Sequence, residues 1–441
     1  MAVLIGRTYH VFQNASLTVL GNGARVGSSS EFGTRPKRYP TASTGVMMAK
    51  IVCVLYPDPV DGFPPKYARD DIPAVDGYPG GQTTPTPDAV DFNPGELLGS
   101  VSGELGLRKF LEERGHTLVV TSDKEGPDSE LERELPDADV VISQPFWPAY
   151  LSKARIEKAP NLKLAITAGI GSDHVDLDAA IERGMTVAEV TYSNSISVAE
   201  HAVMQILALV RNYLPSHKWA AEGGWNIADC VANAYDLEGM NVGVIAAGRI
   251  GVAVLRRLAP FDVNLHYTDK RRLPREVEEE LGLTYHPDAR ALARAVDVVS
   301  IHCPLHPETE GLFDEELIGS MKRGSYIINT ARAQIVDQEA VTAALKSGQL
   351  AGYAGDVWYP QPAPADHPWR TAPHNGMTPH VSGTTLSAQA RYAAGTREIL
   401  EDYLAQRPIR DEYLIVDGGS LAGTGAASYT AGSGTAPGVS A

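Results

Sequence analysis

The chain is poor in cysteine, contains no long apolar run and has fewer basic than acidic residues. Its three cysteines, Cys53, Cys230 and Cys303, stand at wide, unrelated spacings. They predict neither a disulfide framework nor a metal site, and they favour a reduced, intracellular compartment. No apolar run approaches the roughly 20 residues that span a bilayer. The 38 basic and 54 acidic side chains give a formal charge of −16, which disfavours binding to nucleic acid or to an anionic membrane.

What is present is the composition of a globular protein with two domains. Hydrophobic residues make up 43% of the chain and charged residues 21%, as in soluble proteins. A chain of 441 residues is too long for one ordinary core and suits two domains of roughly 150–200 residues each. An anionic small substrate would need local positive charge inside a cleft, because the molecule as a whole is acidic.

The two ends of the chain differ from its body. Residues 1–47 hold five basic residues against the single acid Glu31, which is the balance of a mitochondrial transit peptide. We favour the alternative of an over-long start or a vector-derived leader, since the segment shows no convincing amphipathic helix and a strand-like run follows Met48. Residues 425–441 are rich in Gly, Ser, Ala and Thr and predict a flexible tail. We expect a cytoplasmic protein, or a mitochondrial one if residues 1–47 are a true transit peptide.

Short apolar runs alternate with helical patterns along the body, which is typical of parallel βα units. Strand-like runs at 118–120, 140–142 and 164–166 form a first series, and a second series begins at Asn241. A Pro-, Gly- and Asp-rich stretch at 58–95 predicts a long surface loop. The body should therefore hold two βα series, each with its own parallel sheet.

Two helices connect these series. A long helix is expected at 198–214, capped by Ser197 and stopped by Pro215. The last helical pattern, at 387–404, should return to the first domain. The predicted fold class is α/β, with two Rossmann-like domains and a cleft between them. We expect a flavodoxin-like catalytic domain at 48–194 and 382–424, and a dinucleotide-binding domain at 195–381 inserted into it.

The central motif is a glycine-containing turn between a strand and a helix. Residues 242–251 end in the pattern Ala246-x-Gly248-x-x-Gly251, close to the Gly-x-Gly-x-x-Gly turn that binds dinucleotides. Gly248 lets the backbone approach a diphosphate, and Gly251 lets the helix pack tightly on the strand. The helix N-terminus offers free N–H groups to the phosphates. Ala246 replaces the first glycine and demands a different turn.

An acid in the right place strengthens this prediction. Asp269 lies eighteen residues after Gly251, at the end of the next strand-like run. A carboxylate there accepts hydrogen bonds from ribose hydroxyls and repels a 2′-phosphate, which favours NAD over NADP. The cations Lys270, Arg271 and Arg272 blur this preference, and a turn or cap role for Asp269 is the structural alternative.

Three polar residues further on suggest the chemistry. Arg332 follows the strand-like run 326–328, and a guanidinium gives a bidentate grip on a carboxylate. Gln361 stands between two prolines, and His380 follows Pro379. Alone, Arg332 is more simply a surface arginine and His380 a structural histidine. Their order after the dinucleotide turn is the specific signal.

This order resembles the D-2-hydroxyacid dehydrogenase superfamily, whose arginine binds the substrate carboxylate and whose histidine is the acid/base. That family has a glutamate where this chain has Gln361. The substitution, together with the motifs at 145–147, 170–176, 192–195 and 246–251, is similar to NAD-dependent formate dehydrogenase of the bacterial type. The similarity extends from Lys50 to about Thr424. Ala333 and Gln334 depart from the Gly-Lys expected after the arginine.

The resemblance implies formate as substrate, NAD as cofactor, no metal, and a homodimer that uses the long helix after Asn194. It implies the catalytic residues Arg332, His380, Gln361 and Asn194. It implies substrate contacts from Ile170, Asn194, Arg332, Pro145 and Phe146. It implies cofactor contacts from Gly248, Arg249, Ile250, Gly251, Asp269, Pro304, His306, Thr330, Asp356, His380, Ser382, Gly383 and Ser195.

The chemistry of formate agrees with a glutamine at position 361. Oxidation of a hydroxy acid releases a hydride and a hydroxyl proton, so a histidine must accept that proton. Formate has no hydroxyl, and loss of its hydride leaves neutral CO₂, so no general base is needed. Two alternatives stay open: a 2-hydroxyacid dehydrogenase or glyoxylate reductase, and a non-catalytic NAD-sensing protein on the same fold.

Overall fold

The structure is a computed structural model that describes residues 48–56, 105–423 and 429. The predicted leader, the predicted surface loop at 58–95 and every residue of the predicted tail except Tyr429 lie outside this part of the chain. Within these described ranges, no helix is long and apolar enough to cross a membrane.

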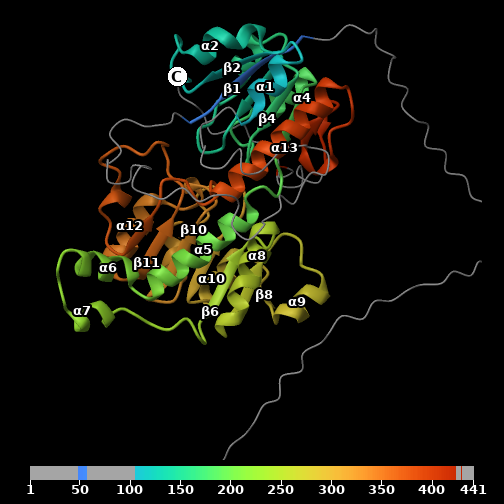
Figure 1. The fold of residues 1–441 in the computed structure, drawn as a ribbon. Coiled ribbons are helices and arrows are strands. Elements are labelled where there is room, and N and C mark those ends of the chain that lie inside the picture. The colour runs from blue at the N-terminus through green and yellow to red at the C-terminus, as the bar shows by residue number, and fades with distance from the viewer. Residues whose placement is uncertain (1–47, 57–104, 424–428, 430–441) are drawn as a thin grey trace, which may run out of the picture. The chain divides into compact units, whose positions relative to one another are not determined.

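The first sheet of the described chain has the strand order β14-β13-β5-β4-β3-β1-β2 (Figure 1). Strands β1 to β5 pair in parallel, whereas β13 and β14 form an antiparallel edge. The strand bounds are β1 Lys50–Val54, β2 Thr117–Thr121, β3 Val140–Ser143, β4 Leu164–Thr167, β5 Thr186–Glu189, β13 Leu414–Asp417 and β14 Ser420–Leu421.

The second sheet has the order β12-β11-β10-β9-β6-β7-β8, and its pairs are parallel. Its strands are β6 Asn241–Ile245, β7 Asn264–Thr268, β8 Thr284–Tyr285, β9 Val298–Ile301, β10 Ser325–Asn329, β11 Leu350–Gly355 and β12 Asn375–Met377. The strand-like runs of the sequence thus fall into two sheets, as predicted.

Helices connect the strands. Those of the first sheet are α1 Leu107–Glu112, α2 Glu130–Glu134, α3 Lys153–Lys158, α4 Leu177–Arg183 and α13 Leu386–Leu404. Those beside the second sheet are α5 Ser195–Val210, α6 Tyr213–Ala221, α7 Ile227–Val231, α8 Arg249–Leu258, α9 Arg275–Leu281, α10 Ala289–Ala295, α11 Glu315–Ser320 and α12 Gln338–Ser347.

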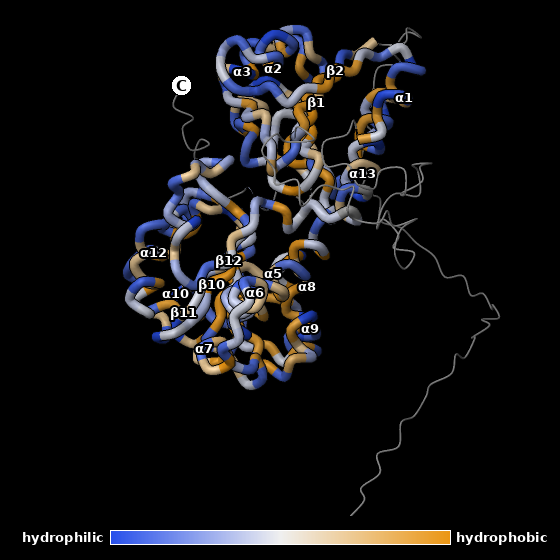
Figure 2. Tube along the Cα trace, turned by 60° about the vertical axis from the view of Figure 1, so that its left-hand side comes forward, coloured by the Kyte–Doolittle hydropathy of each residue, from blue (hydrophilic) through white to orange (hydrophobic). Residues whose placement is uncertain are grey.

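Burial on both faces explains why the strands are continuous apolar runs. Along β1, Ile51 and Cys53 enter one core cluster, while Val52 and Val54 enter the other, because successive side chains of a strand point to opposite faces. Parallel sheets that are covered on both faces need such unbroken apolar sequences. Figure 2 shows the hydrophobic residues gathered along the strands.

The chain leaves the first sheet after β5, builds the second sheet, and returns through α13. Tyr392 and Leu400 of α13 lie in the same core cluster as Ile51 of β1. The predicted α/β class, with the second unit inserted into the first, is therefore confirmed. The boundaries at 194 and 382 stay predictions.

The long helix differs from the prediction at both ends. Helix α5 begins at Ser195 and ends at Val210, because Asn212 adopts a left-handed conformation with φ 50° and starts α6. Pro215 lies in the first turn of α6. A backbone N–H in the first turn has no carbonyl partner within the helix, so a proline there costs no helical hydrogen bond. Ser197 caps nothing, since its hydroxyl is 2.8 Å from Thr385 Oγ1.

Candidate active site

The predicted site residues stand on loops or in the first turns of helices that follow the carboxyl ends of strands, where parallel sheets place their ligands. In chain order, Pro145 and Phe146 follow β3, Ile170 follows β4, Asn194 and Ser195 follow β5, Gly248 to Gly251 follow β6, Asp269 follows β7, Pro304 and His306 follow β9, Thr330 and Arg332 follow β10, Asp356 and Gln361 follow β11, and His380 to Gly383 follow β12.

The glycine turn has the geometry that its sequence demands. Ala246 takes a left-handed φ of 70°, so it adopts the backbone that a glycine would take more easily. A Cβ on Gly251 would stand 2.2 Å from Ala246 O, whereas a Cβ on Gly248 would meet no described atom within 4 Å. Helix α8 starts at Arg249 without a side-chain cap. Open space at Gly248 and free N–H groups at α8 suit a diphosphate.

Asp269 is tied to this turn. Its Oδ2 accepts a hydrogen bond from Ala247 N at 2.8 Å, and its Oδ1 accepts one from Arg271 N at 2.8 Å. The cation Lys270 pairs with Glu308 at 2.5 Å, and Arg272 pairs with Glu278. The carboxylate therefore fixes the turn between β6 and α8, and two nearby cations are neutralised by surface partners.

Arg332 forms an ion pair with a residue that the sequence analysis left without a role. Its Nε lies 3.1 and 3.0 Å from the two carboxylate oxygens of Asp173, and its Nη2 lies 2.5 Å from Oδ1. Its Nη1 donates to Ala331 O at 2.9 Å. An arginine has five N–H donors, so among the described residues one donor on each of Nη1 and Nη2 remains for a ligand.

His380 and Gln361 lie in a chain of hydrogen bonds. His380 Nδ1 is 2.9 Å from Gln361 Oε1, and Gln361 Nε2 donates to Phe146 O at 2.8 Å. Because the amide nitrogen faces a carbonyl, the amide oxygen must face His380, which makes Nδ1 the protonated nitrogen. Burial lowers the pKa of His380 to about 4. The imidazole is therefore neutral at neutral pH.

Asp356 holds the segment that carries His380. Its carboxylate accepts hydrogen bonds from Thr378 Oγ1 at 2.5 Å, Val381 N at 2.8 Å and Ser382 N at 2.6 Å. His380 itself has a left-handed φ of 59°. These bonds brace a strained backbone position, which is a role that the sequence analysis did not anticipate for Asp356.

Several polar atoms at predicted contact positions are buried without a partner. Among the described residues, Asn194 Oδ1, Ser195 Oγ and Thr330 Oγ1 accept or donate no hydrogen bond. A buried polar atom left without a partner costs about 1–3 kcal/mol. Asn194 is also in close contact with Gly383, where a Cβ would stand 2.7 Å from its Nδ2. These positions suit a polar ligand such as a dinucleotide with a small anion.

The loop with Ile170 is anchored by a buried acid that the sequence analysis missed. Glu189 Oε2 accepts from Gly171 N at 3.0 Å, from Ser172 Oγ at 3.1 Å and from Tyr429 OH at 3.3 Å. Burial raises the pKa of Glu189. Glu189 is an acidic residue at the end of the buried strand β5, and this position was the signal from which its role could have been predicted. No pattern in the sequence around Tyr429 predicts its contact with Glu189.

Three other predicted cofactor contacts, Pro304, His306 and Arg249, interact with neighbouring residues of the chain. Pro304 and His306 form a turn with Thr309, whose hydroxyl donates to Pro304 O at 2.7 Å. The His306 ring meets the Tyr429 ring edge-on, with centroids 6.2 Å apart. The Arg249 guanidinium stacks over the Tyr192 ring at 3.7 Å.

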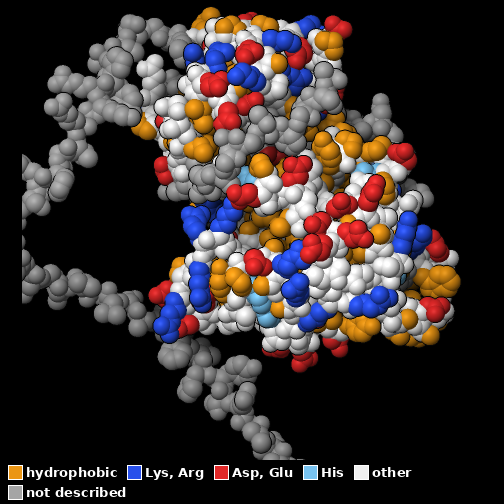
Figure 3. All heavy atoms as spheres, turned by 180° about the vertical axis from the view of Figure 1, so that it is seen from behind, with side chains coloured by type: hydrophobic (Ala, Val, Ile, Leu, Met, Phe, Trp, Pro, Cys, Tyr) orange, Lys and Arg blue, Asp and Glu red, His pale blue; other side chains and the backbone are white. Residues whose placement is uncertain are grey.

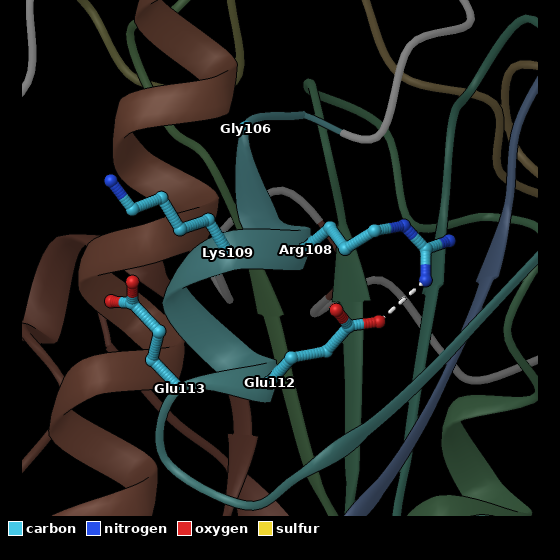
Figure 4. A pocket seen from close by; sticks show the side chains of 5 residues that line it. All are labelled: Gly106, Arg108, Lys109, Glu112 and Glu113. Atoms are coloured by element: carbon cyan, nitrogen blue, oxygen red, sulfur yellow. Dashed lines mark hydrogen bonds and ion pairs between the residues drawn. The ribbon is translucent and has the colours of Figure 1, made fainter.

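A separate hollow of about 490 Å³ lies on α1 (Figure 4). It is lined by Gly106, Arg108, Lys109, Glu112 and Glu113, and Arg108 pairs with Glu112 at 2.7 Å. It contains none of the predicted site residues. In the described residues, no cluster of three or more His, Cys, Asp or Glu side chains is placed to hold a metal ion.

The fold and this site define a dehydrogenase class. Residues 203–382 match the family described as D-isomer specific 2-hydroxyacid dehydrogenase, NAD binding domain. A formate dehydrogenase of Pseudomonas sp. (strain 101) is 72% identical over 388 residues, which are 88% of this chain and 97% of the relative. A mitochondrial formate dehydrogenase of Solanum tuberosum is 52% identical over 76% of this chain and 87% of its own length.

Solved structures agree with these relatives. The Granulicella formate dehydrogenase is 69% identical with a TM-score of 0.78, over 85% of this chain and 100% of the other. An NAD-dependent formate dehydrogenase from Staphylococcus aureus, solved in complex with NAD, is 44% identical with a TM-score of 0.70, over 84% and 99%. The chain belongs to the formate dehydrogenase family, as the sequence predicted.

Proposed function

We propose that the chain oxidises formate to carbon dioxide by direct transfer of a hydride to NAD⁺. The observation that carries this proposal is the partner of His380. Where a hydroxyacid dehydrogenase has a carboxylate, the imidazole here meets the neutral amide of Gln361 at 2.9 Å. Such a pair holds the ring in one orientation without titrating near neutral pH, which suits a reaction that releases no proton.

The cofactor requirement agrees with the residues present. NAD⁺ supplies the hydride acceptor when it is bound. Its diphosphate would lie at Gly248 and the start of α8, and its adenosine ribose near Asp269. The unpartnered Ser195 and Thr330 hydroxyls would find partners there. Asp269 would disfavour a 2′-phosphate through repulsion between negative charges.

Formate would be held by donors from both halves of the chain. The remaining N–H groups of Arg332 Nη1 and Nη2, the amide of Asn194 and the backbone of Ile170 would orient its two oxygens. Pro145 and Phe146 would close the pocket and exclude water. Breaking the C–H bond of HCOO⁻ with its electron pair leaves CO₂, so His380 has no proton to move. Positioning of two reactants supplies up to about 7–11 kcal/mol of barrier reduction in ideal cases.

Deuterated formate tests the proposal directly. With DCOO⁻ and NAD⁺, the wild-type protein should form NADH carrying one deuterium, at a lower rate than with HCOO⁻. Arg332→Ala should abolish turnover while NAD binding is retained, and Arg332→Lys should be poor because one ammonium cannot replace two fixed N–H donors. Absence of deuterium from NADH would exclude direct transfer. Turnover of glyoxylate without turnover of formate would show that the protein is a hydroxyacid dehydrogenase. Binding of NAD without either reaction would show that it is a non-catalytic NAD sensor.

We also propose a homodimer, whose interface we place on the segment that follows the long helix α5 and not on that helix, which the resemblance implied. The α6–α7 arm, residues 211–236, has large exposed apolar side chains, including Trp225 at 89%, Ile227 at 67% and Val231 at 57% exposure. Neither α6 nor α7 has a buried residue. Figure 3 shows hydrophobic side chains gathered at the edge of the molecule that carries these helices. A contiguous apolar surface of this kind favours a protein partner, and a second copy is the simplest one.

The cytoplasm is the proposed compartment. Cys230 and the buried Cys303 are free thiols in the part of the chain that the structure describes, as expected under reducing conditions. Cell fractionation of full-length protein and of a variant starting at Met48 tests this. Uptake by mitochondria that depends on residues 1–47 would show that the alternative is correct.

A further inference from the structure

We propose that Asp173 is a positioning residue for formate, which acts by holding the guanidinium of Arg332 in the orientation that presents two free N–H groups to the substrate. This inference rests on the proposed function. It assigns a role to a carboxylate that faces the substrate-binding arginine and yet needs no contact with the substrate itself.

The geometry of the pair shows what Asp173 controls. Arg332 Nε and Nη2 form the edge that meets the carboxylate, at 3.0 and 2.5 Å from its oxygens. The opposite branch, Nη1, donates to Ala331 O at 2.9 Å. A planar guanidinium held on two sides cannot rotate about its long axis. The two donors that have no partner among the described residues, one each on Nη1 and Nη2, therefore have fixed directions.

The loop with Asp173 is built to keep the carboxylate in place. Gly171 N and Ser172 Oγ both donate to Glu189, at 3.0 and 3.1 Å, and Thr167 Oγ1 lies 2.9 Å from Ser172 Oγ. A Cβ on Gly171 would stand 2.0 Å from Arg332 Nη2. The loop thus packs directly against the guanidinium, and only a glycine at 171 leaves room for it.

The charges of the pair stay constant across the working pH range. Burial acts to raise the pKa of Asp173, but the charge of Arg332 and its hydrogen bonds outweigh burial and hold that pKa well below its usual range. Both groups are ionised at any pH at which the enzyme would act. Asp173 therefore offsets the positive charge of Arg332 without introducing a titration.

The contact also joins the two halves of the site. Asp173 follows β4 of the first sheet and Arg332 follows β10 of the second. An arginine that must bind formate from one half is thus oriented by a carboxylate from the other. Loss of this carboxylate would leave an unpaired, partly buried cation next to Glu189, with which it also interacts electrostatically.

The experiment compares Asp173→Asn with Asp173→Glu and with the matched control Glu316→Gln, which removes the carboxylate of a surface pair with Arg290. For Asp173→Asn we expect the KM for formate to rise about tenfold or more, while the KM for NAD⁺ changes less than about twofold. Nitrate serves as a planar anionic probe of the formate site, and its inhibition constant against formate should rise by a similar factor. Asp173→Glu should recover part of the loss, and Glu316→Gln should match wild type.

The outcomes separate this inference from the proposed function. If the wild type oxidises formate and Asp173→Asn leaves its KM unchanged, Asp173 does not position Arg332. A lower KM in that variant would mean that the carboxylate competes with formate for the guanidinium, which also overturns the inference. If Asp173→Asn does not fold, Asp173→Glu is measured in its place. An equal rise in the KM for formate and in the KM for NAD⁺ in folded Asp173→Glu would show that Asp173 has only a structural role. Inactivity of the wild type towards formate would instead refute the proposed function.

Discussion

At the scale of single residues, Gln361 explains most about the chemistry. Its amide accepts from His380 Nδ1 and at the same time donates to Phe146 O. A glutamate could accept from the histidine but could not donate to the carbonyl, and its carboxylate would repel that oxygen. Only an amide satisfies both neighbours. The glutamine thus gives His380, which burial keeps neutral, a partner that does not titrate, and it also links the loop after β11 to the loop after β3.

Replacing this residue tests its role. In Gln361→Glu, a carboxylate beside the imidazole should raise the pKa of His380 above its present value of about 4. The rate of formate oxidation should then depend on pH where the pair titrates, with shared rather than individual pKa values. The variant should also gain trace reduction of a small 2-oxo acid such as glyoxylate. Rate profiles measured with both substrates check this, and a variant profile as flat as that of wild type would contradict it.

At the scale of elements, the turn between β6 and α8 depends on the strand that follows it. Asp269 at the end of β7 accepts a hydrogen bond from Ala247 N, so one carboxylate serves both the turn and the predicted ribose contact. Gly251 is fixed by the nearness of Ala246 O. The turn and the acid therefore act as one unit.

Substitution of Asp269 separates charge from geometry. Asp269→Ala and Asp269→Gln should weaken the use of NAD⁺ and raise that of NADP⁺, since repulsion of the 2′-phosphate is removed. Asp269→Asn is the matched control, because it keeps an oxygen for Ala247 N but not the charge. The ratio of kcat/KM for the two cofactors is the measurement. An unchanged ratio in all three variants would assign cofactor choice to Lys270, Arg272 or the turn itself.

The α6–α7 arm gives a second prediction at this scale. Trp225→Ser with Val231→Lys should convert the proposed dimer to a monomer, because it places polar groups in an apolar interface. Phe261→Ser, at a side chain that is 37% exposed outside the arm, is the control. Sedimentation velocity measures the mass. A monomeric wild type, or a double variant that still dimerises, would show that this surface is not the interface.

At the scale of the whole molecule, histidines should make stability sensitive to acid. Burial lowers the pKa of His174 to about 4, of His302 to about 3 and of His380 to about 4. The unfolded chain binds protons at these sites near pH 6.5, so their contribution is fully present above that pH. It should be lost as the pH falls from 6.5 towards 4, at up to roughly 1.4 kcal/mol per pH unit for each histidine.

Urea unfolding between pH 7.5 and 4.5 measures this loss. His302→Gln should reduce the slope of the free energy of unfolding against pH by up to the contribution of one proton, since a glutamine cannot titrate. A free energy of unfolding that is constant from pH 6.5 to 4.5 would contradict the prediction.

The fold was largely predictable because buried parallel strands leave strong local patterns. Runs such as 140–142 and 164–166 fall within β3 and β4, and the glycine turn marks the start of α8. The bounds of α5 were wrong because a left-handed Asn212 leaves no sequence signal comparable to a proline. The order of the motifs supplies the candidate site residues, and their roles stay predictions. The pairing of Arg332 with Asp173 was not, since the two are 159 residues apart and meet only through the tertiary fold.

The central claim is that formate is oxidised without a proton-transfer group, and the dependence of the wild-type rate on pH tests it most directly. Initial rates of NADH formation at saturating NAD⁺ should be measured with formate, and NADH consumption with glyoxylate, from acidic to alkaline pH. We predict a rate with formate that is flat through the neutral range and falls only as the pH approaches the His380 pKa of about 4. A bell-shaped profile centred near neutrality, with glyoxylate preferred over formate, would contradict it.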